Sequence, residues 1–434
     1  MSISGNTSGS TTGNTTGSKP VRPLVIGVSE AGVGVLARQL QDRIAAADLV
    51  IAAPRFHPDL QQLSARSDTA SAPQKISDWP VPFSNIYRML EDNHDKSLVI
   101  LATGDPMWFG VGASLAQRLG ADGCEVVPAV SGLQLAAARL GWAFSHCAVV
   151  SIHGRPITNI IPSLYPRARL LIIAAGSSSP PAVAELLTKN GFGAAQMTVL
   201  AHLGGAEESR FDGKAETWDH PDIPDFHILA VDCGPVDFGA ALMPRPLNGF
   251  AAPDSSFDND GKLTKHDVRA SALAKLAPFP GAVLWDIGSG SGAVSIDFLR
   301  SAGRGSAFAI DRSEKQQQFC ADNAARHGVS GVHFVLGEAE AVIGDLPTPD
   351  AIFIGGGMSP DIIKRAQASL RGGGVLVAHA VTIESESQLV EAWQKTGGSL
   401  TRISVQHADP VGAFHGWRPL MPVTRWCWHK GESK

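Results

Sequence analysis

The sequence predicts an α/β protein with mostly parallel sheets, made of two domains of which the first has two subdomains. Two observations indicate this fold class. Short apolar runs alternate with helical patterns along most of the chain, and a glycine-rich turn joins a strand to a helix at residues 284–298. With 434 residues, of which 44% are hydrophobic, the chain is long enough to bury two or three cores.

The first subdomain is expected at residues 21–145. Its predicted strands and helices alternate, which is typical of a mostly parallel sheet. The helix at 132–140 follows Ser131, a residue type that caps helix N-termini. The strands are expected at 21–28, 48–53, 97–106 and 124–130, and the other helices at 34–47 and 112–119.

The second subdomain is expected at residues 146–236. Its helix at 180–191 has proline near the start and glycine at the end. Its strands are expected at 147–154, 168–176, 196–205 and 226–233. Residues 237–260 are rich in Pro, Gly, Asn and Asp, so they are interpreted as a linker, and residues 1–20 are expected to form a disordered tail.

The second domain is expected at residues 261–434. An amphipathic helix at 263–276 leads into the glycine-rich turn. Later strands are expected at 332–337, 350–356 and 373–381. Residues 401–430 are expected to form two antiparallel strands around a loop.

The glycine-rich turn, LWDIGSGSGAVSIDF, is the most informative motif of the chain. An apolar strand ends in Asp286, and Gly288, Gly290 and Gly292 follow at alternate positions before a helix begins. Asp311 ends the next expected strand, so the unit is a nucleotide-binding βαβ motif. Glycine is needed here because a Cβ would keep the backbone away from a ligand.

The ligand of this motif is predicted to be S-adenosylmethionine (SAM), although the glycines also match the dinucleotide pattern G-x-G-x-x-G/A. Asp286 can pair with an amino-acid ammonium, whereas it would repel a pyrophosphate. Gly292 is a third alternate glycine that a dinucleotide site does not need. Asp311 is expected to hold the ribose hydroxyls of either ligand, and a tight turn without ligand is the structural alternative. The order of elements matches a Rossmann-like class I methyltransferase domain.

A second signature, TGDPMWFG, lies at residues 103–110. A strand ends in Thr103, and Gly104, Asp105 and Pro106 turn sharply before a helix. Pro106 fixes its own φ and restrains the residue before it. Such a turn holds backbone groups toward a ligand at the carboxyl end of a sheet, although taken alone it is a common turn.

Composition excludes several function classes. The net charge of −5 and the aromatic content of 6%, without a basic and aromatic cluster, argue against a nucleic-acid partner. No pair among the five cysteines has metal or redox spacing, which predicts free thiols and no metal site. No apolar run approaches the roughly 20 residues that span a bilayer, and residues 1–18 lack the regions of a signal peptide. The chain is therefore expected to be cytoplasmic and not to bind membranes.

Several motifs occur in the order seen in the tetrapyrrole methylase family: TGDPMWFG, VVPAVSGLQLAAARLG, HGR and AHLGGAEESRFDG. The second domain is similar to the partner enzyme of that pathway through DGKLTKHDVRA, LWDIGSGSGAVSID, GEAEA, FIGGG and FHGWRPLMPVTRW. Apart from residues 1–20, the whole chain resembles the family of fused precorrin-6Y C(5,15)-methyltransferases (decarboxylating) of aerobic cobalamin synthesis.

The chain departs from the family pattern at two places in its first half. The turn after the first strand is VIGVSEAGVG, with Ser29 and Glu30 where a glycine-rich turn is usual. The segment APRFH at residues 53–57 replaces a Gly-Gly-x-Arg-His-like run. Both departures concern expected substrate contacts, and neither touches the Gly104-Asp105-Pro106 turn.

The resemblance implies that the first domain methylates carbon 5 of a precorrin. It also implies that the second domain methylates carbon 15 and decarboxylates the acetate on carbon 12, which gives precorrin-8. Because the methyl group of SAM is already activated, no side-chain nucleophile is expected, and the enzyme supplies alignment and exclusion of water. The conjugated macrocycle provides the electron sink for decarboxylation.

The motifs and the resemblance together assign candidate ligand contacts. The expected cofactor contacts are Gly104, Asp105, Pro106, Ser131, Thr264, Asp286, Gly288, Ser289, Gly290, Ser291, Gly292, Asp311 and Ala339. Because a precorrin carries many carboxylates, basic side chains are expected around it. The expected substrate contacts are Lys265, Arg269 and Arg418, the first two on one helix face. For Thr264, a plain helix N-cap is the alternative.

Two other functions stay open at this point. The same two folds can act on another tetrapyrrole or on a different small acceptor. Alternatively, the chain is a corrinoid-binding protein whose first domain has lost SAM, which the Ser29-Glu30 turn suggests. In each case the partner is a small tetrapyrrole or similar molecule, and a homo-oligomer is expected because members of both families commonly associate.

Overall fold

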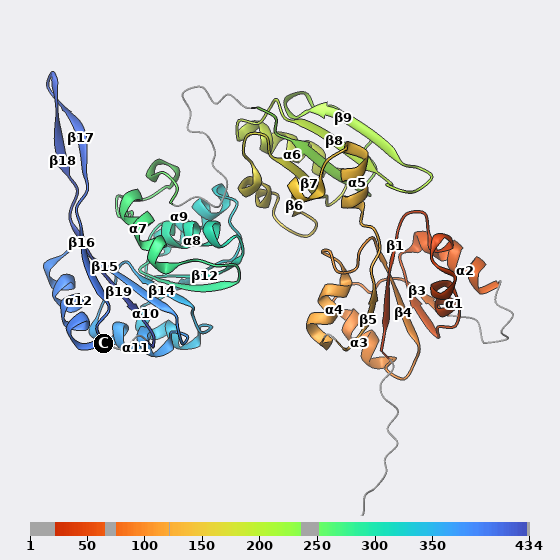
Figure 1. Ribbon diagram of the computed structural model, residues 1–434, viewed down its shortest axis with the longest axis horizontal. Helices are drawn as coiled ribbons and strands as arrows, with labels where there is room; N and C mark the ends of the chain where they lie inside the picture. Colours follow the sequence, from red (N-terminus) through yellow and green to blue (C-terminus); the bar gives the residue numbers. More distant parts are fainter. Residues whose placement is uncertain (1–21, 66–74, 121, 236–250, 432–434) are drawn as a thin grey trace, which may run out of the picture. The chain divides into compact units, whose positions relative to one another are not determined.

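Among the residues that it describes, the computed structural model shows three β-sheets and a separate two-stranded hairpin (Figure 1). The expected tail at 1–20 and residues 236–250 of the expected linker lie outside the described residues. The structure describes residues 22–65, 75–120, 122–235 and 251–431.

The chain divides into two compact units. Of the described residues, the first unit contains those up to 146 together with 199–211 and 223–228, and the second contains the others. The first unit thus holds the whole first sheet, together with residues that come from the predicted second subdomain.

The first sheet has five parallel strands in the order β3-β2-β4-β1-β5. Apolar clusters cover both of its faces, one containing Ile26 and the other Val25, so its central strands are apolar throughout. The strands are β1 (Leu24–Val28), β2 (Leu49–Ile51), β3 (Lys75–Ser77), β4 (Leu98–Thr103) and β5 (Glu125–Val127). The helices are α1 (Arg38–Ala45), α2 (His57–Ala65), α3 (Asn85–Asp92), α4 (Val111–Leu119) and α5 (Gly132–Leu140).

The second sheet has the strand order β6-β7-β10-β8-β9. Sequence patterns predicted four of these strands but missed β9, whose sequence SRFDGK is largely polar. Its burial alternates because it lies at the edge of the sheet with one face toward solvent. The elements are β6 (Ala148–Ser151), β7 (Arg169–Ile173), α6 (Ser179–Lys189), β8 (Gln196–Ala201), β9 (Ser209–Lys214) and β10 (His227–Asp232).

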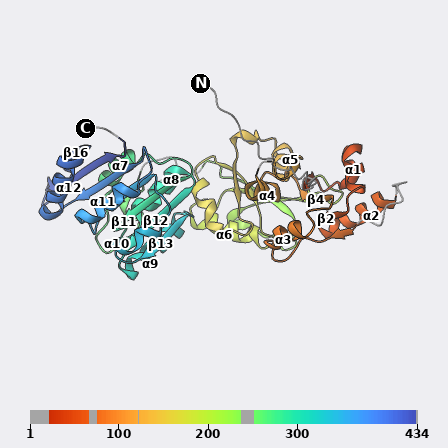
Figure 2. The same ribbon diagram turned by 90° about the horizontal axis from the view of Figure 1, so that it is seen from below.

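The third sheet has seven strands in the order β13-β12-β11-β14-β15-β19-β16. Figure 2 labels β11, β12, β13 and β16 of this sheet. The strands from β13 to β15 are parallel, and β19 and β16 are antiparallel. The strands are β11 (Ala282–Ile287), β12 (Gly305–Asp311), β13 (Val332–Leu336), β14 (Ala351–Ile354), β15 (Val375–Ala380), β16 (Ser399–Ile403) and β19 (Val423–His429). The helices are α7 (His266–Leu276), α8 (Ala293–Ala302), α9 (Glu314–Arg326), α10 (Ala339–Val342), α11 (Pro360–Ser369) and α12 (Ile383–Thr396).

Apolar cores lie on both faces of this sheet because neighbouring residues of a strand point to opposite sides. Ile352 and Leu376 belong to one core, which α11 and α12 cover. Phe353 and Val377 belong to the other, which α7 and α8 cover. The sheet is therefore buried between two layers of helices, as predicted for the second domain.

The C-terminal part of the chain differs from the prediction of two antiparallel strands around a loop. Four strands occur there: β16 and β19 join the third sheet, while β17 (Gln406–Val411) and β18 (Phe414–Pro419) form the separate hairpin. Sequence patterning could not separate a sheet strand from a hairpin strand, because both alternate with a period of two.

The second half of the predicted linker also belongs to the second domain. Ala251, Ala252 and Phe257 are buried in the cores that contain α7 and α8 residues. This domain therefore includes residues 251–260, and its boundary lies before the predicted one at Gly261. Composition suggested a linker because the segment is rich in Asp, Asn and Pro. In the structure, however, Asp254 accepts a hydrogen bond from Arg269 and Asp260 accepts one from Gln316, and these bonds attach the segment to the domain.

Candidate functional site

A cavity with a volume of ≈ 410 Å³ lies at the carboxyl end of the third sheet. The loops that follow β11, β12, β13 and β14 line it, because the carboxyl ends of parallel strands meet at one edge. Four predicted cofactor contacts line this cavity: Gly288, Gly290, Asp311 and Ala339. Residues 355–357 of the FIGGG motif also line it, and the size is typical of a small-molecule site.

The three alternate glycines serve different purposes. All have positive φ, of 70°, 53° and 77° in chain order. A Cβ on Gly288 would lie 2.6 Å from the backbone nitrogen of Gly356, and a Cβ on Gly292 would overlap Cys320 Sγ. A Cβ on Gly290 meets nothing closer than 3.8 Å. Gly288 and Gly292 therefore permit close packing, whereas the open side of Gly290 is where a ligand can approach the backbone.

Asp311 supports the glycine turn from the end of β12. Its Oδ2 accepts a hydrogen bond from the Gly290 N–H at 3.0 Å, and its Oδ1 accepts one from the Ser313 N–H at 3.0 Å. Each carboxylate oxygen can accept more than one hydrogen bond, so both keep capacity for the hydroxyls of a ribose. The position fits the predicted role.

Asp286 does not line the cavity, and its role as the partner of a ligand ammonium stays a prediction. It is 1% exposed, and its Oδ2 accepts hydrogen bonds from the backbone N–H and the hydroxyl of Ser295 on α8. Burial raises the pKa of this carboxyl to about 6, although the Ser295 hydrogen bonds act in the opposite direction. Its Oδ1 is buried without a hydrogen-bond partner. Asp286 thus holds the turn against α8 behind the cavity wall.

The other predicted contacts near the turn lie behind or beside the cavity. Ser291 is 3% exposed, and its carbonyl accepts a hydrogen bond from the Asn323 side chain. Ser289 donates its N–H to the Ile310 carbonyl at 3.0 Å. Thr264 is not the N-cap of α7, because that position belongs to Lys265. The three stay predictions as cofactor contacts.

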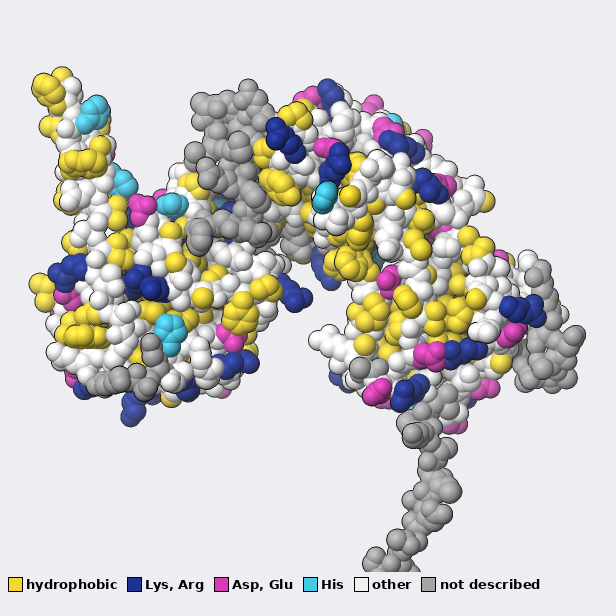
Figure 3. Space-filling model, in the orientation of Figure 1, with side chains coloured by type: hydrophobic (Ala, Val, Ile, Leu, Met, Phe, Trp, Pro, Cys, Tyr) yellow, Lys and Arg dark blue, Asp and Glu magenta, His cyan; other side chains and the backbone are white. Residues whose placement is uncertain are grey.

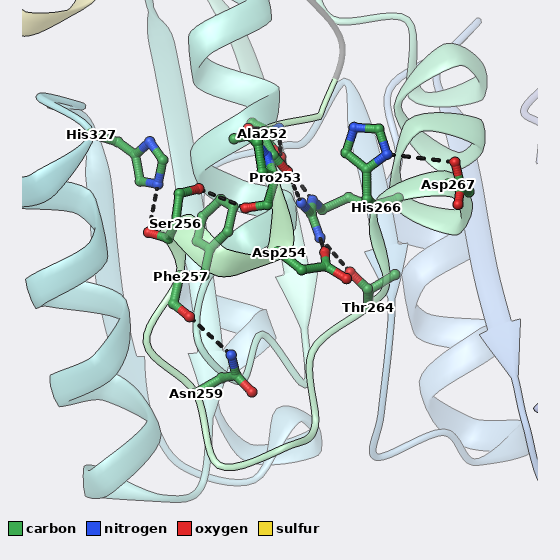
Figure 4. A network of polar contacts seen from close by, with 12 residues as sticks. Ala252, Pro253, Asp254, Ser256, Phe257, Asn259, Thr264, His266, Asp267 and His327 are labelled. Atoms are coloured by element: carbon green, nitrogen blue, oxygen red, sulfur yellow. Dashed lines mark hydrogen bonds and ion pairs between the residues drawn. The ribbon is translucent and has the colours of Figure 1, made fainter. Parts of the chain in front are cut away.

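Arg269 was expected to bind substrate, but the structure places it in the core. Its side chain has no exposed surface and forms ion pairs with Asp297 at 2.7 Å and Asp254 at 3.1 Å. It also donates hydrogen bonds to the carbonyls of Ala252 and Thr264. Figure 4 shows Ala252, Asp254 and Thr264 within this network. An arginine so fully paired has no charge to offer a substrate carboxylate, which corrects the prediction.

The other two predicted substrate contacts lie elsewhere. Lys265 is exposed as the N-cap of α7, whereas Arg269, one turn later, is buried. Arg418 lies on the β17–β18 hairpin, where its exposed side chain pairs with Asp409 at 3.3 Å. Neither lines the cavity at the glycine turn. Their roles toward substrate remain predictions.

In the first domain, the Gly104-Asp105-Pro106 turn follows β4 as predicted. Gly104 has φ 68° and donates its N–H to the Val28 carbonyl at 2.8 Å. Asp105 Oδ1 accepts a hydrogen bond from the Met107 N–H at 2.9 Å, which stabilises the turn locally. The turn therefore has one defined conformation at the carboxyl end of the first sheet, beside the end of β1.

Ser131 lies next to this turn in space. A Cβ on Gly104 would be 3.4 Å from the Ser131 Cα. The Ser131 hydroxyl accepts a hydrogen bond from the Gln134 N–H, while the Gln134 side chain accepts one from the Ser131 N–H, so the pair forms a capping box. The predicted helix cap is confirmed, and this use of the hydroxyl leaves a cofactor contact at Ser131 untested.

The two departures from the family pattern meet at the same edge of the first sheet. Arg55 Nε lies 2.8 Å from Glu30 Oε1, and Arg55 also donates a hydrogen bond to the Thr103 hydroxyl. The Arg55 guanidinium lies 4.7 Å from the Phe226 ring centroid, and His202 Nδ1 lies 3.4 Å from Glu30 Oε2. Sequence reasoning noted both segments but could not predict that they pair, because they follow different strands.

Within the described ranges, no group of three or more His, Cys, Asp or Glu side chains is placed to hold a metal ion. Four of the five cysteines, Cys124, Cys233, Cys320 and Cys427, are buried, and Cys147 is half-buried. Among the helices that the structure describes, none has the length and apolar character needed to cross a membrane.

Family models match both domains of the chain. Residues 24–219 match the tetrapyrrole (corrin/porphyrin) methylases, and residues 255–430 match a precorrin methyltransferase domain. A precorrin-6Y C(5,15)-methyltransferase [decarboxylating] from Sinorhizobium sp is 38% identical over 408 residues, which cover 94% of this chain and 96% of the relative. The chain belongs to the precorrin-6Y C(5,15)-methyltransferase (decarboxylating) family. This confirms the family and the fold class predicted from two fused signatures.

Two further proteins are similar to this chain. The relative of the same name from Mycobacterium tuberculosis (strain CDC 1551 / Oshkosh) is 35% identical, over 93% of this chain and 98% of its own length. The crystal structure of the C-terminal domain of precorrin-6Y C5,15-methyltransferase from Rhodobacter capsulatus is 38% identical. It covers 42% of this chain and 99% of that chain, with a TM-score of 0.41.

Proposed function

We propose that this protein uses SAM to methylate carbons 5 and 15 of precorrin-6Y and decarboxylates its carbon-12 acetate, in cobalamin biosynthesis. The observation that carries the proposal is the cavity at Gly290 and Asp311, in a chain that belongs to the precorrin-6Y C(5,15)-methyltransferase family along nearly its full length. A cavity between a glycine turn and a ribose-binding carboxylate fits the adenosyl part of SAM.

The residues of the cavity position ligands rather than attack them. SAM, when bound, supplies a methyl group that is activated by its sulfonium. Gly290 lets the ligand approach the backbone, Asp311 accepts hydrogen bonds from ribose hydroxyls, and Ala339 begins α10 just after β13, where an adenine would fit. Alignment and exclusion of water can supply most of the acceleration for such a transfer.

The two reactions are assigned to the two domains. The first domain, with the Gly104-Asp105-Pro106 turn, methylates carbon 5, and the second domain methylates carbon 15 and releases carbon dioxide. In decarboxylation the electrons of the broken carbon–carbon bond pass into the conjugated macrocycle, so the protein needs no separate electron sink. The side-chain carbon that loses carbon dioxide then takes up a proton from solvent and becomes a methyl group. Desolvation of the acetate carboxylate favours its loss as a neutral molecule.

The test is incubation of the full-length protein with SAM and precorrin-6Y, followed by mass spectrometry of the product. The proposal expects two added methyl groups and the loss of one carbon dioxide. Unchanged precorrin-6Y would contradict it. The variant Asp311→Ala tests whether the two domains carry out separate reactions, because it should still add one methyl group but release no carbon dioxide. Loss of both methylations in this variant would contradict independent sites.

We also propose that the chain forms homo-oligomers through the β17–β18 hairpin. Phe414 is 79% exposed and Trp417 is 73% exposed, and Figure 3 shows hydrophobic side chains along this hairpin. Large apolar side chains gathered on a projecting element are typical of an interface that another chain covers. A second copy is the partner that a homo-oligomer requires.

Light scattering coupled to gel filtration tests this assembly. The wild-type protein should have a mass that is a multiple of the 45.5 kDa chain, and Phe414→Ser with Trp417→Ser should lower it. Ile383→Ser is the matched control, because Ile383 is 82% exposed on α12, outside the hairpin. A monomeric wild-type protein would contradict the proposal.

A further inference from the structure

Residues 251–264, here called the strap, lead into the N-cap of α7. Asp260 and Lys262 of the strap line the cavity. A Cβ on Gly290 would lie 3.8 Å from the Lys262 carbonyl oxygen, so the strap faces the open side of that glycine. The strap is thus a wall of the same site, although the sequence suggested a linker for most of it.

The strap is held at a defined distance from the glycine turn by one buried side chain. Asn323 of α9 has no exposed surface. Its Oδ1 accepts a hydrogen bond from the Asp258 N–H at 2.8 Å, and its Nδ2 donates to the carbonyls of Asp258 at 2.9 Å and Ser291 at 3.0 Å. Because Ser291 belongs to the glycine turn, Asn323 connects both walls. Asp260 and Lys262 are therefore presented to the cavity from a fixed backbone.

Five charged residues line the cavity among the residues that the structure describes: Asp260, Lys262, Asp311, Arg312 and Glu338. Arg312 and Glu338 pair with each other at 3.5 Å, and Asp311 binds the glycine turn and is placed for ribose hydroxyls. Asp260 and Lys262 remain, one acid and one base on the strap, with Lys262 Nζ 3.9 Å from Asp260 Oδ2.

The surroundings of Asp260 favour the negatively charged form of its carboxyl group. Gln316 donates a hydrogen bond to its Oδ2 at 2.8 Å, and this bond is the main cause that lowers the pKa of Asp260. A carboxylate has about four acceptor positions, so capacity remains for a further donor. The Lys262 side chain is 83% exposed, and its ammonium can therefore move toward a bound anion.

We propose that Asp260 and Lys262 bind the amino-acid end of SAM, with Asp260 accepting hydrogen bonds from its ammonium and Lys262 donating to its carboxylate. The inference rests on the proposed use of SAM and adds two contacts to its site. A zwitterion matches an acid and a base that lie side by side on one wall. The pair takes over the role that the sequence suggested for Asp286, whose carboxylate is buried behind the glycine turn.

Binding calorimetry on the full-length protein tests this inference with two ligands. S-adenosylhomocysteine carries the amino-acid end, and 5′-deoxy-5′-methylthioadenosine has the same nucleoside without it. Asp260→Asn and Lys262→Gln should each weaken S-adenosylhomocysteine binding by about 10-fold, which is the loss expected for one charge-assisted hydrogen bond. Binding of methylthioadenosine should change by less than about 2-fold, because that ligand does not reach either side chain.

The matched controls are Asp267→Asn and Lys275→Gln, which remove the same charges from exposed positions of α7 and should change neither affinity. Asp260→Asn and Lys262→Gln should weaken S-adenosylhomocysteine binding at the second domain alone. Binding at a site in the first domain serves as an internal reference. Equal losses for the two ligands would overturn the inference and leave the strap a structural wall. Unchanged S-adenosylhomocysteine binding would overturn it too. Failure of the wild-type protein to bind S-adenosylhomocysteine would instead overturn the proposed function.

Discussion

Arg269 and Asp297 form a buried ion pair, with Arg269 Nε 2.7 Å from Asp297 Oδ2. The side chain of Arg269 has no exposed surface, and that of Asp297 is 2% exposed. The Asp297 carboxylate also accepts hydrogen bonds from the Ala252 N–H, at 3.1 and 3.0 Å. The pair therefore attaches the start of the strap to α7 and α8.

Arg269→Met should lower the free energy of unfolding of the second domain by roughly 3–5 kcal/mol, because it leaves a buried carboxylate without its main partner. Urea denaturation followed by tryptophan fluorescence measures the change. Lys265→Met, at an exposed neighbouring position, should change stability by less than about 0.5 kcal/mol. Weaker binding of precorrin-6Y by Arg269→Met, with stability unchanged, would restore the substrate role predicted from sequence.

Gly290→Ala and Gly292→Ala should separate ligand binding from folding. Both positions have positive φ, which costs an alanine about 1–2 kcal/mol. At Gly292 the new Cβ would also overlap Cys320 Sγ, so this variant should be clearly less stable. At Gly290 the Cβ would enter the cavity, and this variant should stay folded but bind S-adenosylhomocysteine at least about 10-fold more weakly. Thermal unfolding and calorimetry give the two readouts, and equal stability losses would contradict the assignment.

Asp286 should make the second domain less stable as pH rises. Burial raises its folded-state pKa to about 6, above the ordinary value of 3.8, so the folded state binds the proton more tightly. The stabilisation is full below about pH 4, falls as pH rises to about 6, and is absent above that. The free energy of unfolding of Asp286→Asn should therefore rise by about 3 kcal/mol relative to that of wild type as pH increases from 4 to 7. Denaturation at several pH values tests this, and a constant difference would contradict the buried charge.

His379 should have the opposite pH dependence. It is buried on β15 beside Arg425, and burial first, then the charge of Arg425, lower its pKa to about 3. The unfolded state binds the proton at about pH 6.5, so stability is lost as pH falls from about 6.5 toward 3. As pH falls through that range, the free energy of unfolding of His379→Asn should decrease by about 1.4 kcal/mol less per pH unit than that of wild type. Urea denaturation between pH 7 and pH 5 measures the free energies of unfolding. If those of wild type and variant fall in parallel, His379 becomes protonated in the folded state, which would contradict the prediction.

The parts of the site that sequence could predict are local. The glycine turn and Asp311 lie within one βαβ unit, and the Gly104-Asp105-Pro106 turn follows its strand directly, so residue spacing was enough. Ser131 caps α5 through a partner three residues away. Such features depend on backbone conformation and nearest neighbours, which residue type and order largely determine.

The parts that sequence could not predict depend on distant partners. Helical spacing suggested that Lys265 and Arg269 share an exposed face. The helix begins at His266, however, and Arg269 forms ion pairs with Asp254 and Asp297. Likewise, the composition of the strap suggested a linker, because nothing in it predicts its hydrogen bonds to Asn323.

Motifs and strand patterns were enough to predict the family, the two-domain α/β fold and the glycine turn as a ligand site, because they are local and occur in a fixed order. Which charges are available to a ligand depends instead on the tertiary structure. It buried Asp286 and Arg269 and placed Asp260 and Lys262 at the cavity. The reason is physical: a charged side chain acts on a ligand or within the core according to what surrounds it, and those neighbours come from distant parts of the chain.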